Sequence, residues 1–197
     1  MKTFKANPNR YENTAIAAYQ QMIRERIEQG WHPSLLTFTF NPMPDNRALP
    51  PEAIGKSLAQ FYSLCLTRLI HHPHRGPITN LPLMVGMPDL PLFKHRKISV
   101  VATINDGLHA HAVFLKPIRT RNGRTLASTL EENGNLFKDA CHLMSIHCAD
   151  IKETPGKAVA YVLKSLDLKR FPGDDIWIFP KSRSERTKAS RRVSRHD

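Results

Sequence analysis

Several features that define whole classes of protein are missing from this sequence of 197 residues. No stretch approaches the roughly 18 consecutive apolar residues of a membrane-spanning helix, and the N-terminus lacks the apolar run of a secretory signal. Cysteine is scarce, and its odd count of three argues against a disulfide framework and for a reducing compartment. We therefore expect a cytoplasmic protein.

Acidic residues are also few: the chain has 17 Asp and Glu and 29 Lys and Arg, which gives a formal net charge of +12. Such an excess suggests a polyanionic partner, nucleic acid first and an anionic membrane second. Residues 181–197 hold seven basic and two acidic residues and almost no apolar side chain, which predicts a disordered basic tail. The tail's net charge of +5 leaves +7 on the preceding residues, so the body of the chain is basic as well.

Helical periodicity alternates with strand-like composition along the chain. The Asp106-Gly107 pair is typical of a hairpin turn and predicts that its two flanking strands pair. Interleaved helices and a hairpin favour an α+β fold with a central antiparallel sheet and flanking helices, a ferredoxin-like sandwich or a relative. The predicted helices are 13–29, 51–70, 135–144 and 155–168, and the predicted strands are 34–41, 83–86, 98–104, 108–115, 145–151 and 176–179. The predicted division is a helical extension (1–33), one folded domain (34–180) and the tail (181–197).

Two histidines on one predicted strand are the first candidate site. His109 and His111 are two residues apart, so their side chains project from the same face of the strand. Two adjacent imidazoles can supply two neighbouring positions around a divalent metal ion. A His-x-His pair is also common on a polar strand face, so the spacing alone leaves both interpretations open.

A tyrosine with two lysines is the second candidate. Tyr161 and Lys164 are three residues apart on the predicted helix 155–168, and Lys157 lies four residues before the tyrosine. They lie off the apolar stripe, so we expect Tyr161 at the surface. A tyrosine hydroxyl can act as a covalent nucleophile towards phosphorus when a cation or metal lies nearby. An ordinary amphipathic helix with a snorkelling lysine is the alternative.

The other His and Cys residues do not form a convincing metal-binding pattern. Cys141-His142 and His147-Cys148 do not have the usual spacing of zinc ligands, and we expect buried thiols instead. The run from His71 to His74 is expected to complement the C-terminal end of a helix rather than to bind metal.

Three motifs in this order resemble the HUH endonuclease superfamily, specifically the rolling-circle replication initiators. The first is the strand motif Leu-Thr-Phe-Thr-Phe-Asn at 36–41. The second is a His, hydrophobic, His motif, here His109-Ala110-His111, and the third is a helical tyrosine followed by lysine, here Tyr161 and Lys164. The resemblance spans about 34–168 and implies that the tyrosine helix lies beside the histidine strand.

The resemblance implies site-specific nicking and rejoining of single-stranded DNA at an origin hairpin, which starts rolling-circle replication of a bacterial plasmid or phage-like element. His109 and His111 would hold Mg²⁺ or Mn²⁺, Tyr161 would form a covalent 5′-phosphotyrosine, and Lys164 would orient the tyrosine or the phosphate. The chain has no Gly-x-x-x-x-Gly-Lys phosphate loop, so a helicase would have to come from the host. A host polymerase would be the second protein partner. No membrane partner is expected. The expected DNA-contacting residues are Thr37, Thr39, Asn41 and Lys157.

Relatives in this superfamily usually supply a third metal ligand, which the predicted partner strand 98–104 does not offer. Asp150, just before the tyrosine helix, is the first candidate, followed by His147, His95 and Asp106. A transposase or conjugative relaxase of the same superfamily would share this chemistry. A non-catalytic nucleic-acid-binding module is the alternative from another class, since a fold does not fix a function.

Overall fold

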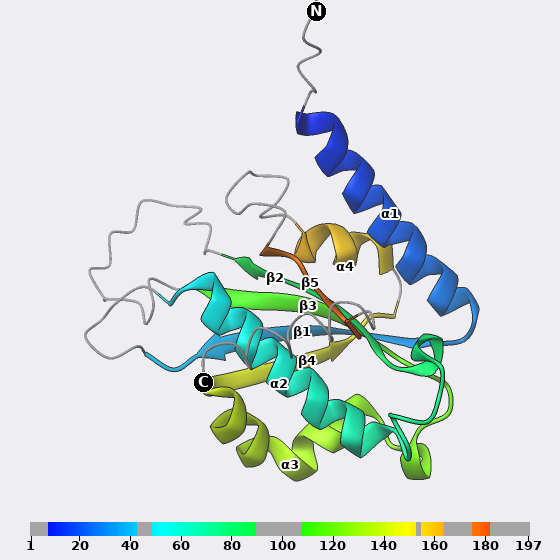
Figure 1. The fold of residues 1–197 in the computed structure, drawn as a ribbon, viewed down its shortest axis with the longest axis vertical. Coiled ribbons are helices and arrows are strands. Elements are labelled where there is room, and N and C mark those ends of the chain that lie inside the picture. The colour runs from blue at the N-terminus through cyan, green and yellow to red at the C-terminus, as the bar shows by residue number, and fades with distance from the viewer. Residues whose placement is uncertain (1–7, 43–48, 90–107, 153–154, 164–174, 182–197) are drawn as a thin grey trace, which may run out of the picture.

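The central layer of the protein is a five-stranded antiparallel sheet with strand order β4-β1-β3-β2-β5 (Figure 1). The structure is a computed structural model that describes residues 8–42, 49–89, 108–152, 155–163 and 175–181. Its sheet and flanking helices confirm the predicted α+β class with a central antiparallel sheet. The strands are β1 (His32–Phe40), β2 (Leu83–Asp89), β3 (His109–Lys116), β4 (Leu143–Asp150) and β5 (Trp177–Phe179).

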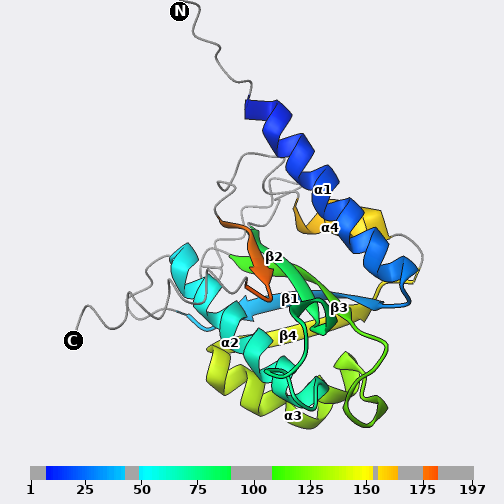
Figure 2. The same cartoon turned by 45° about the vertical axis from the view of Figure 1, so that its right-hand side comes forward.

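Helices cover both faces of the sheet (Figures 1 and 2). Helices α2 (Pro51–Leu69) and α3 (Leu126–Cys141) pack on one face, and α1 (Pro8–Glu28) and α4 (Pro155–Val162) pack on the other. Two short 3-10 turns, η2 (Ile78–Asn80) and η4 (Arg121–Gly123), precede β2 and α3. None of the helices in the described ranges combines the length and the apolar character needed to cross a bilayer.

The alternation in β1 divides its side chains between two cores. Leu36, Phe38 and Phe40 are buried on the α2/α3 face, where the Phe38 ring meets that of Phe61 edge-on at 4.8 Å. The intervening Thr37 and Thr39 therefore project towards the α1/α4 face. Burial of each large apolar side chain contributes about 1.5–3 kcal/mol. Because of this burial the register of β1 is strongly specified, since a one-residue slip would exchange the two faces.

Helix α1 ends where the sequence predicts. Gly30 has a φ of +85°, a conformation that glycine adopts without the steric cost of a side chain. Its N–H donates to the Ile27 carbonyl at 2.8 Å, and the Trp31 N–H donates to the Arg26 carbonyl at 3.1 Å. These two bonds form a Schellman motif, which turns the chain directly into β1. The helix starts at Pro8, five residues earlier than its predicted start.

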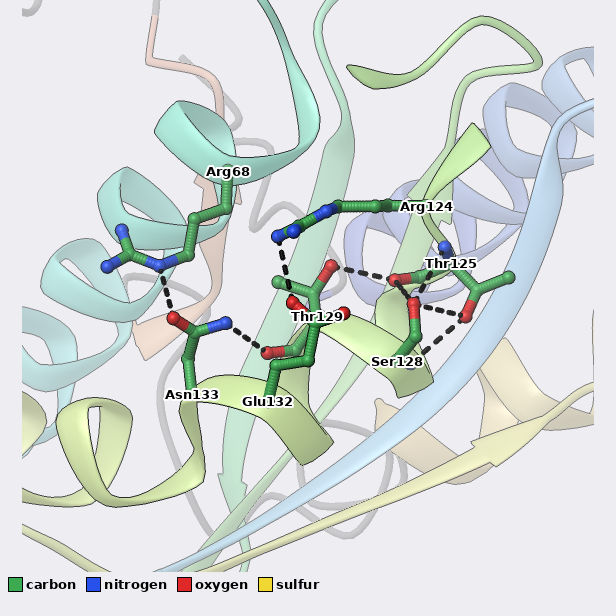
Figure 3. Close-up of polar contacts among 7 residues, drawn as sticks. All are labelled: Arg68, Arg124, Thr125, Ser128, Thr129, Glu132 and Asn133. Atoms are coloured by element: carbon green, nitrogen blue, oxygen red, sulfur yellow. Dashed lines mark hydrogen bonds and ion pairs between the residues drawn. The ribbon is translucent and has the colours of Figure 1, made fainter. Parts of the chain in front are cut away.

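Helix α3 is longer than predicted, because it begins at Leu126 rather than at residue 135 and ends at Cys141. Figure 3 shows the reason at its start: Thr125 Oγ1 accepts from the Ser128 N–H at 3.0 Å, and Ser128 Oγ accepts from the Thr125 N–H at 3.2 Å. This reciprocal pair is a capping box with serine in the place of the usual Glu or Gln. The substitution made the helix start hard to recognise in the sequence.

A kink at Asn133 interrupts the same helix (Figure 3). The side-chain amide of Asn133 donates to the Thr129 carbonyl at 3.0 Å and accepts from Arg68 Nε of α2 at 3.0 Å. The side chain thus replaces a backbone partner and ties the kink to the neighbouring helix. The Asn133-Gly134 pair therefore marks a bend inside the helix and lies N-terminal to the helix start that was predicted at residue 135.

The neighbours of β3 differ from the predicted hairpin. β3 pairs with β1 along one edge and with β2 along the other, both antiparallel. The predicted partner strand 98–104 lies outside the described residues. β2 continues to Asp89, three residues beyond its predicted end, even though it contains Pro88. Pro88 is tolerated because it lies past the last pair between β2 and β5, so among the described strands only β3 lies beside it there.

Candidate metal centre

Asp89, His109 and His111 converge at one end of the sheet. Nε2 of His109 and Nε2 of His111 are 3.0 Å apart, and Oδ2 of Asp89 lies 3.3 Å from the first and 3.6 Å from the second. Asp89 is only 1% exposed and His111 only 4%. A carboxylate with so little access to water needs a compensating positive charge.

The spacing of these three atoms fits ligands around one divalent ion. Two ligand nitrogens about 2.1 Å from a metal lie about 3.0 Å apart at a right angle and about 3.4 Å apart at the tetrahedral angle. The observed separations of 3.0, 3.3 and 3.6 Å cover this range. Among the described residues these two imidazoles and one carboxylate are the ligands that converge, and a set of three leaves further positions around an ion. The three described residues therefore fit a site that could hold a divalent ion.

The third member of this cluster, Asp89, was missed by the sequence analysis. Asp89 is the register partner of His109, so both side chains project from the same face of neighbouring strands. The available signal was a single acidic residue at the end of the apolar run Leu-Met-Val-Gly-Met at 83–87. That signal becomes informative only if β2 and β3 are known to be neighbours.

Asp150, the first candidate for the third ligand, lies elsewhere. It is the register partner of Ser34 on β1, and its carboxylate accepts from the Ser34 hydroxyl at 3.3 Å. Ser34 shares a face with the buried Leu36, so Asp150 projects to the α2/α3 face, opposite to the histidines. The choice of Asp150 is corrected in favour of Asp89.

Thr37 orients one of the two histidines. A hydrogen bond joins Thr37 Oγ1 and His111 Nδ1 at 3.0 Å, and the two residues are register partners on β1 and β3. With Nδ1 engaged by the hydroxyl, Nε2 is the ring nitrogen that points to Asp89. Partners of this kind fix the ring orientation and the tautomer of metal-ligating histidines. Thr37 was predicted as a DNA-contacting residue, whereas its position here supports the metal cluster.

Tyr161 stands directly beside the cluster. Its ring centroid lies 4.7 Å from that of His111, with an interplanar angle of 56°. Val159 and Val162 of the same helix are buried against the sheet and thereby fix this position. Tyr161 itself is 43% exposed, as the sequence predicts. The exposed tyrosine ring thus lies against a largely buried cluster of three residues that could hold a cation.

The remaining predicted site residues lie at varied places. Thr39 is the register partner of His109, Lys157 is exposed on α4, and Asn41 follows the end of β1, where its N–H donates to the His142 carbonyl at 3.2 Å. His147 is exposed on β4 as the register partner of Thr37, one strand away from the cluster. Lys164, His95 and Asp106 lie outside the described residues.

The cysteines lie in or against the other core. Cys65 and Cys141 are buried and Cys148 is half-buried, which confirms the expected buried thiols for the first two. Burial raises the pKa of Cys141 to about 11 and also raises the pKa of Cys65 and of Cys148. These thiols stay protonated at neutral pH and are poor nucleophiles.

No family model matches the chain, nor does any curated protein or solved structure.

Proposed function

We propose that this chain nicks and rejoins single-stranded DNA through Tyr161, with a divalent ion held by Asp89, His109 and His111. The observation that carries the proposal is the position of His111. Its Nε2 lies 3.6 Å from Asp89, and its ring lies 4.7 Å from the Tyr161 ring. A nucleophile beside a cation site is the arrangement that phosphoryl transfer to a protein hydroxyl requires.

Each covalent step has a balanced form. The Tyr161 oxygen loses its proton and attacks phosphorus, a new O–P bond forms, and the bond from phosphorus to the 3′ oxygen breaks. The 3′ oxygen takes up a proton and leaves as a free 3′-hydroxyl, while the 5′-phosphate stays on the tyrosine. In the reverse reaction a 3′-hydroxyl loses its proton and attacks phosphorus, the bond from phosphorus to the Tyr161 oxygen breaks, and that oxygen takes up a proton as the strand is rejoined. Because the covalent bond conserves the phosphodiester energy, no nucleotide cofactor is consumed.

The ion would be Mg²⁺ or Mn²⁺, and when bound it would polarise the phosphoryl oxygens as a Lewis acid. Imidazole is a softer ligand than Mg²⁺ usually takes, so we propose Mn²⁺ as the better fit to two histidines and one carboxylate. Thr37 would hold His111 with Nε2 towards the ion. Lys157, four residues before Tyr161, would contact the phosphate backbone.

The exposure of Tyr161 supports a polymeric substrate. A side chain that is 43% exposed is accessible to a DNA strand lying across the protein surface. The net charge of +12 favours such a polyanion. Initiation of rolling-circle replication remains the proposed biological role, and a transposase or relaxase would use the same residues in the same way.

The experiment that tests this function is capture of the covalent adduct. A library of single-stranded hairpin oligonucleotides labelled at the 3′ end is incubated with the protein and Mn²⁺. Because the tyrosine keeps the 5′-phosphate of the downstream fragment, the label should migrate with the protein on a denaturing gel. Tyr161→Phe and addition of EDTA should each abolish this band. A band of equal intensity with Tyr161→Phe would exclude the mechanism, and a wild type that binds DNA without forming a band would favour the non-catalytic module.

Asp89 and Asp150 offer a matched pair of variants for the metal. Asp89→Asn should lower Mn²⁺ affinity, measured by calorimetry, by at least about tenfold and should abolish the adduct at low Mn²⁺ concentration. Asp150→Asn removes the same charge on the opposite face of the sheet and should change neither quantity. A thermal melt without metal controls for folding. Equal loss in both variants would contradict the assignment of Asp89 as a ligand.

A further inference from the structure

Two neighbouring loops at the end of the sheet away from the metal cluster carry charge of one sign. The loop 71–82 and the loop 117–125 contain four arginines and three histidines and no acidic residue. Of the arginines, Arg124 is paired with Glu132 of α3 at 3.0 Å. We call the other six side chains the basic end: His71, His72, His74, Arg75, Arg119 and Arg121.

The two loops are in contact, so their charges add on one surface. Arg121 Nε donates to His71 Nδ1 at 3.5 Å, which joins side chains 50 residues apart in the sequence. Arg75 and Arg119 are exposed, as are the three histidines. Both loops lie at the lower right of Figure 1, where α2 ends and β2 begins. Like charges gathered without an acidic partner in their own loops favour a polyanion as their partner.

The distance to the metal cluster indicates which polyanion fits. β3 carries His109 at one end and leads at Lys116 into the second loop, so its seven steps separate the two sites by about 24 Å. B-DNA rises about 3.4 Å per base pair, so this distance corresponds to about seven base pairs. A short single strand held at the metal cluster does not have to reach the basic end, whereas a rigid stem beside the nicked segment extends that far.

We propose that the basic end binds the phosphate backbone of a DNA duplex, the stem that flanks the nicked single strand. The assignment of this duplex as the substrate's stem rests on the proposed function, but duplex binding itself does not. Arg75, Arg119 and Arg121 contact phosphates, which anchors the DNA without reading its sequence. The contact supplies affinity, and the metal cluster supplies the chemistry.

A duplex of arbitrary sequence tests the proposal, because backbone binding does not depend on sequence. The test variant carries Arg75→Ala, Arg119→Ala and Arg121→Ala, and the control variant carries Arg24→Ala, Lys56→Ala and Lys138→Ala, three exposed positive charges elsewhere. Fluorescence anisotropy of a labelled 12-base-pair duplex is measured over a range of NaCl concentrations. For the test variant, the slope of log affinity against log salt should fall by about 2 to 3, and affinity at low salt should fall at least about tenfold. The control variant should change the slope by less than about 1.

The outcomes separate this proposal from the proposed function. An unchanged slope in the test variant, or an equal change in the control variant, would overturn the basic end as a duplex site. Adduct formation on a short single strand should be the same in the test variant and the wild type, while adduct formation on a hairpin at 150 mM salt should fall. If the wild type forms no adduct at all, the proposed nicking function is wrong. The duplex measurement then still shows whether the basic end binds a DNA duplex.

Discussion

At the scale of single residues, His111 connects every part of the candidate centre. It contacts Thr37 through Nδ1, His109 and Asp89 through Nε2, and Tyr161 through its ring. Together these contacts constrain the tautomer of His111, the spacing of the three candidate metal ligands and the position of the tyrosine ring. Thr37 is not itself a candidate ligand, so a change there should alter metal binding while all three candidate ligands stay in place.

Thr37→Val tests this dependence. The valine keeps the shape of threonine but removes the hydroxyl that bonds His111 Nδ1, so the ring loses its fixed orientation. We expect Mn²⁺ affinity, measured by calorimetry, to fall by about 10- to 100-fold. Thr37→Ser keeps a hydroxyl and should restore most of the affinity. If the valine variant binds Mn²⁺ as tightly as the wild type, Thr37 does not act through the metal site.

The raised pKa of Cys141 predicts how its alkylation and the stability of the protein depend on pH. Burial disfavours the thiolate of Cys141 and raises its pKa from 9.0 to about 11, so its thiolate fraction at pH 8 is about 100-fold smaller than that of an ordinary thiol. Alkylation of Cys141 by iodoacetamide at pH 8 should be slow in the folded protein and fast in urea, as read by peptide mass spectrometry. Since the unfolded thiol loses its proton first, stability should fall as pH rises from about 9 towards 11. Rapid labelling of the folded protein at pH 8 would contradict this environment.

Local spacing predicted some of these residues and not others. His109 and His111 are two apart on one strand and Tyr161 lies on an amphipathic helix, so short-range periodicity was sufficient to place each on its element. Asp89 depends on the pairing of β2 with β3, which joins segments 20 residues apart and is invisible to local periodicity. Asp150 looked equally suitable because the sequence does not show which face of which strand an acidic residue occupies.

At the scale of elements, the helices differ in how much their neighbours constrain them. α2 begins at Pro51 as predicted and ends one residue before its predicted end, because its apolar stripe and its proline start are local features. α3 depends on contacts that the sequence hides, namely the serine in its capping box and the side chain of Asn133 at its kink. Alanine substitutions at two helix glycines, Gly55 in α2 and Gly134 in α3, can distinguish the effect of helix propensity on stability from the effect of packing.

Gly55 in α2 should not tolerate alanine. A Cβ there would lie 2.5 Å from Trp177 Nε1, so the indole on β5 would have to move. We expect Gly55→Ala to destabilise the protein by about 1–3 kcal/mol in urea unfolding, in spite of the higher helix propensity of alanine. A Cβ at Gly134 in α3 would meet no heavy atom of the described residues within 4 Å beyond its own stretch of helix, so Gly134→Ala should stabilise by about 0.5–1 kcal/mol. The same sign of change in both variants would contradict the packing argument.

At the scale of the whole molecule, the positive charge divides into parts with separate roles. The basic end lies at one end of the sheet and the metal cluster at the other, while the sequence places a further net charge of +5 in 181–197. Under the proposed function the chemistry is carried by Asp89, His109, His111 and Tyr161, so charges elsewhere should act on DNA affinity. Composition alone predicted a polyanionic partner, but it could not separate these surfaces, because side chains 50 residues apart, those of His71 and Arg121, meet only in the fold.

Deletion of 181–197 tests the role of the tail. Loss of its positive charge should weaken DNA binding and lower its salt dependence, measured by anisotropy. Adduct formation at low salt should persist, because the metal cluster and Tyr161 remain intact. Circular dichroism verifies folding of the shortened chain. A folded deletion variant without adduct formation would show that the tail takes part in the reaction.

The pairing of Asp89 on β2 with His109 on β3 limits which insertions and deletions the two strands can accept. The two residues meet because each occupies a position of the same parity in its strand, and an insertion or deletion of one codon within either strand would reverse that parity. A change in length between Val85 or Val113 and the cluster would send one of the two side chains to the far side of the sheet. If the pair binds metal as proposed, related chains that keep the site should vary in length at the turns rather than inside these two strands.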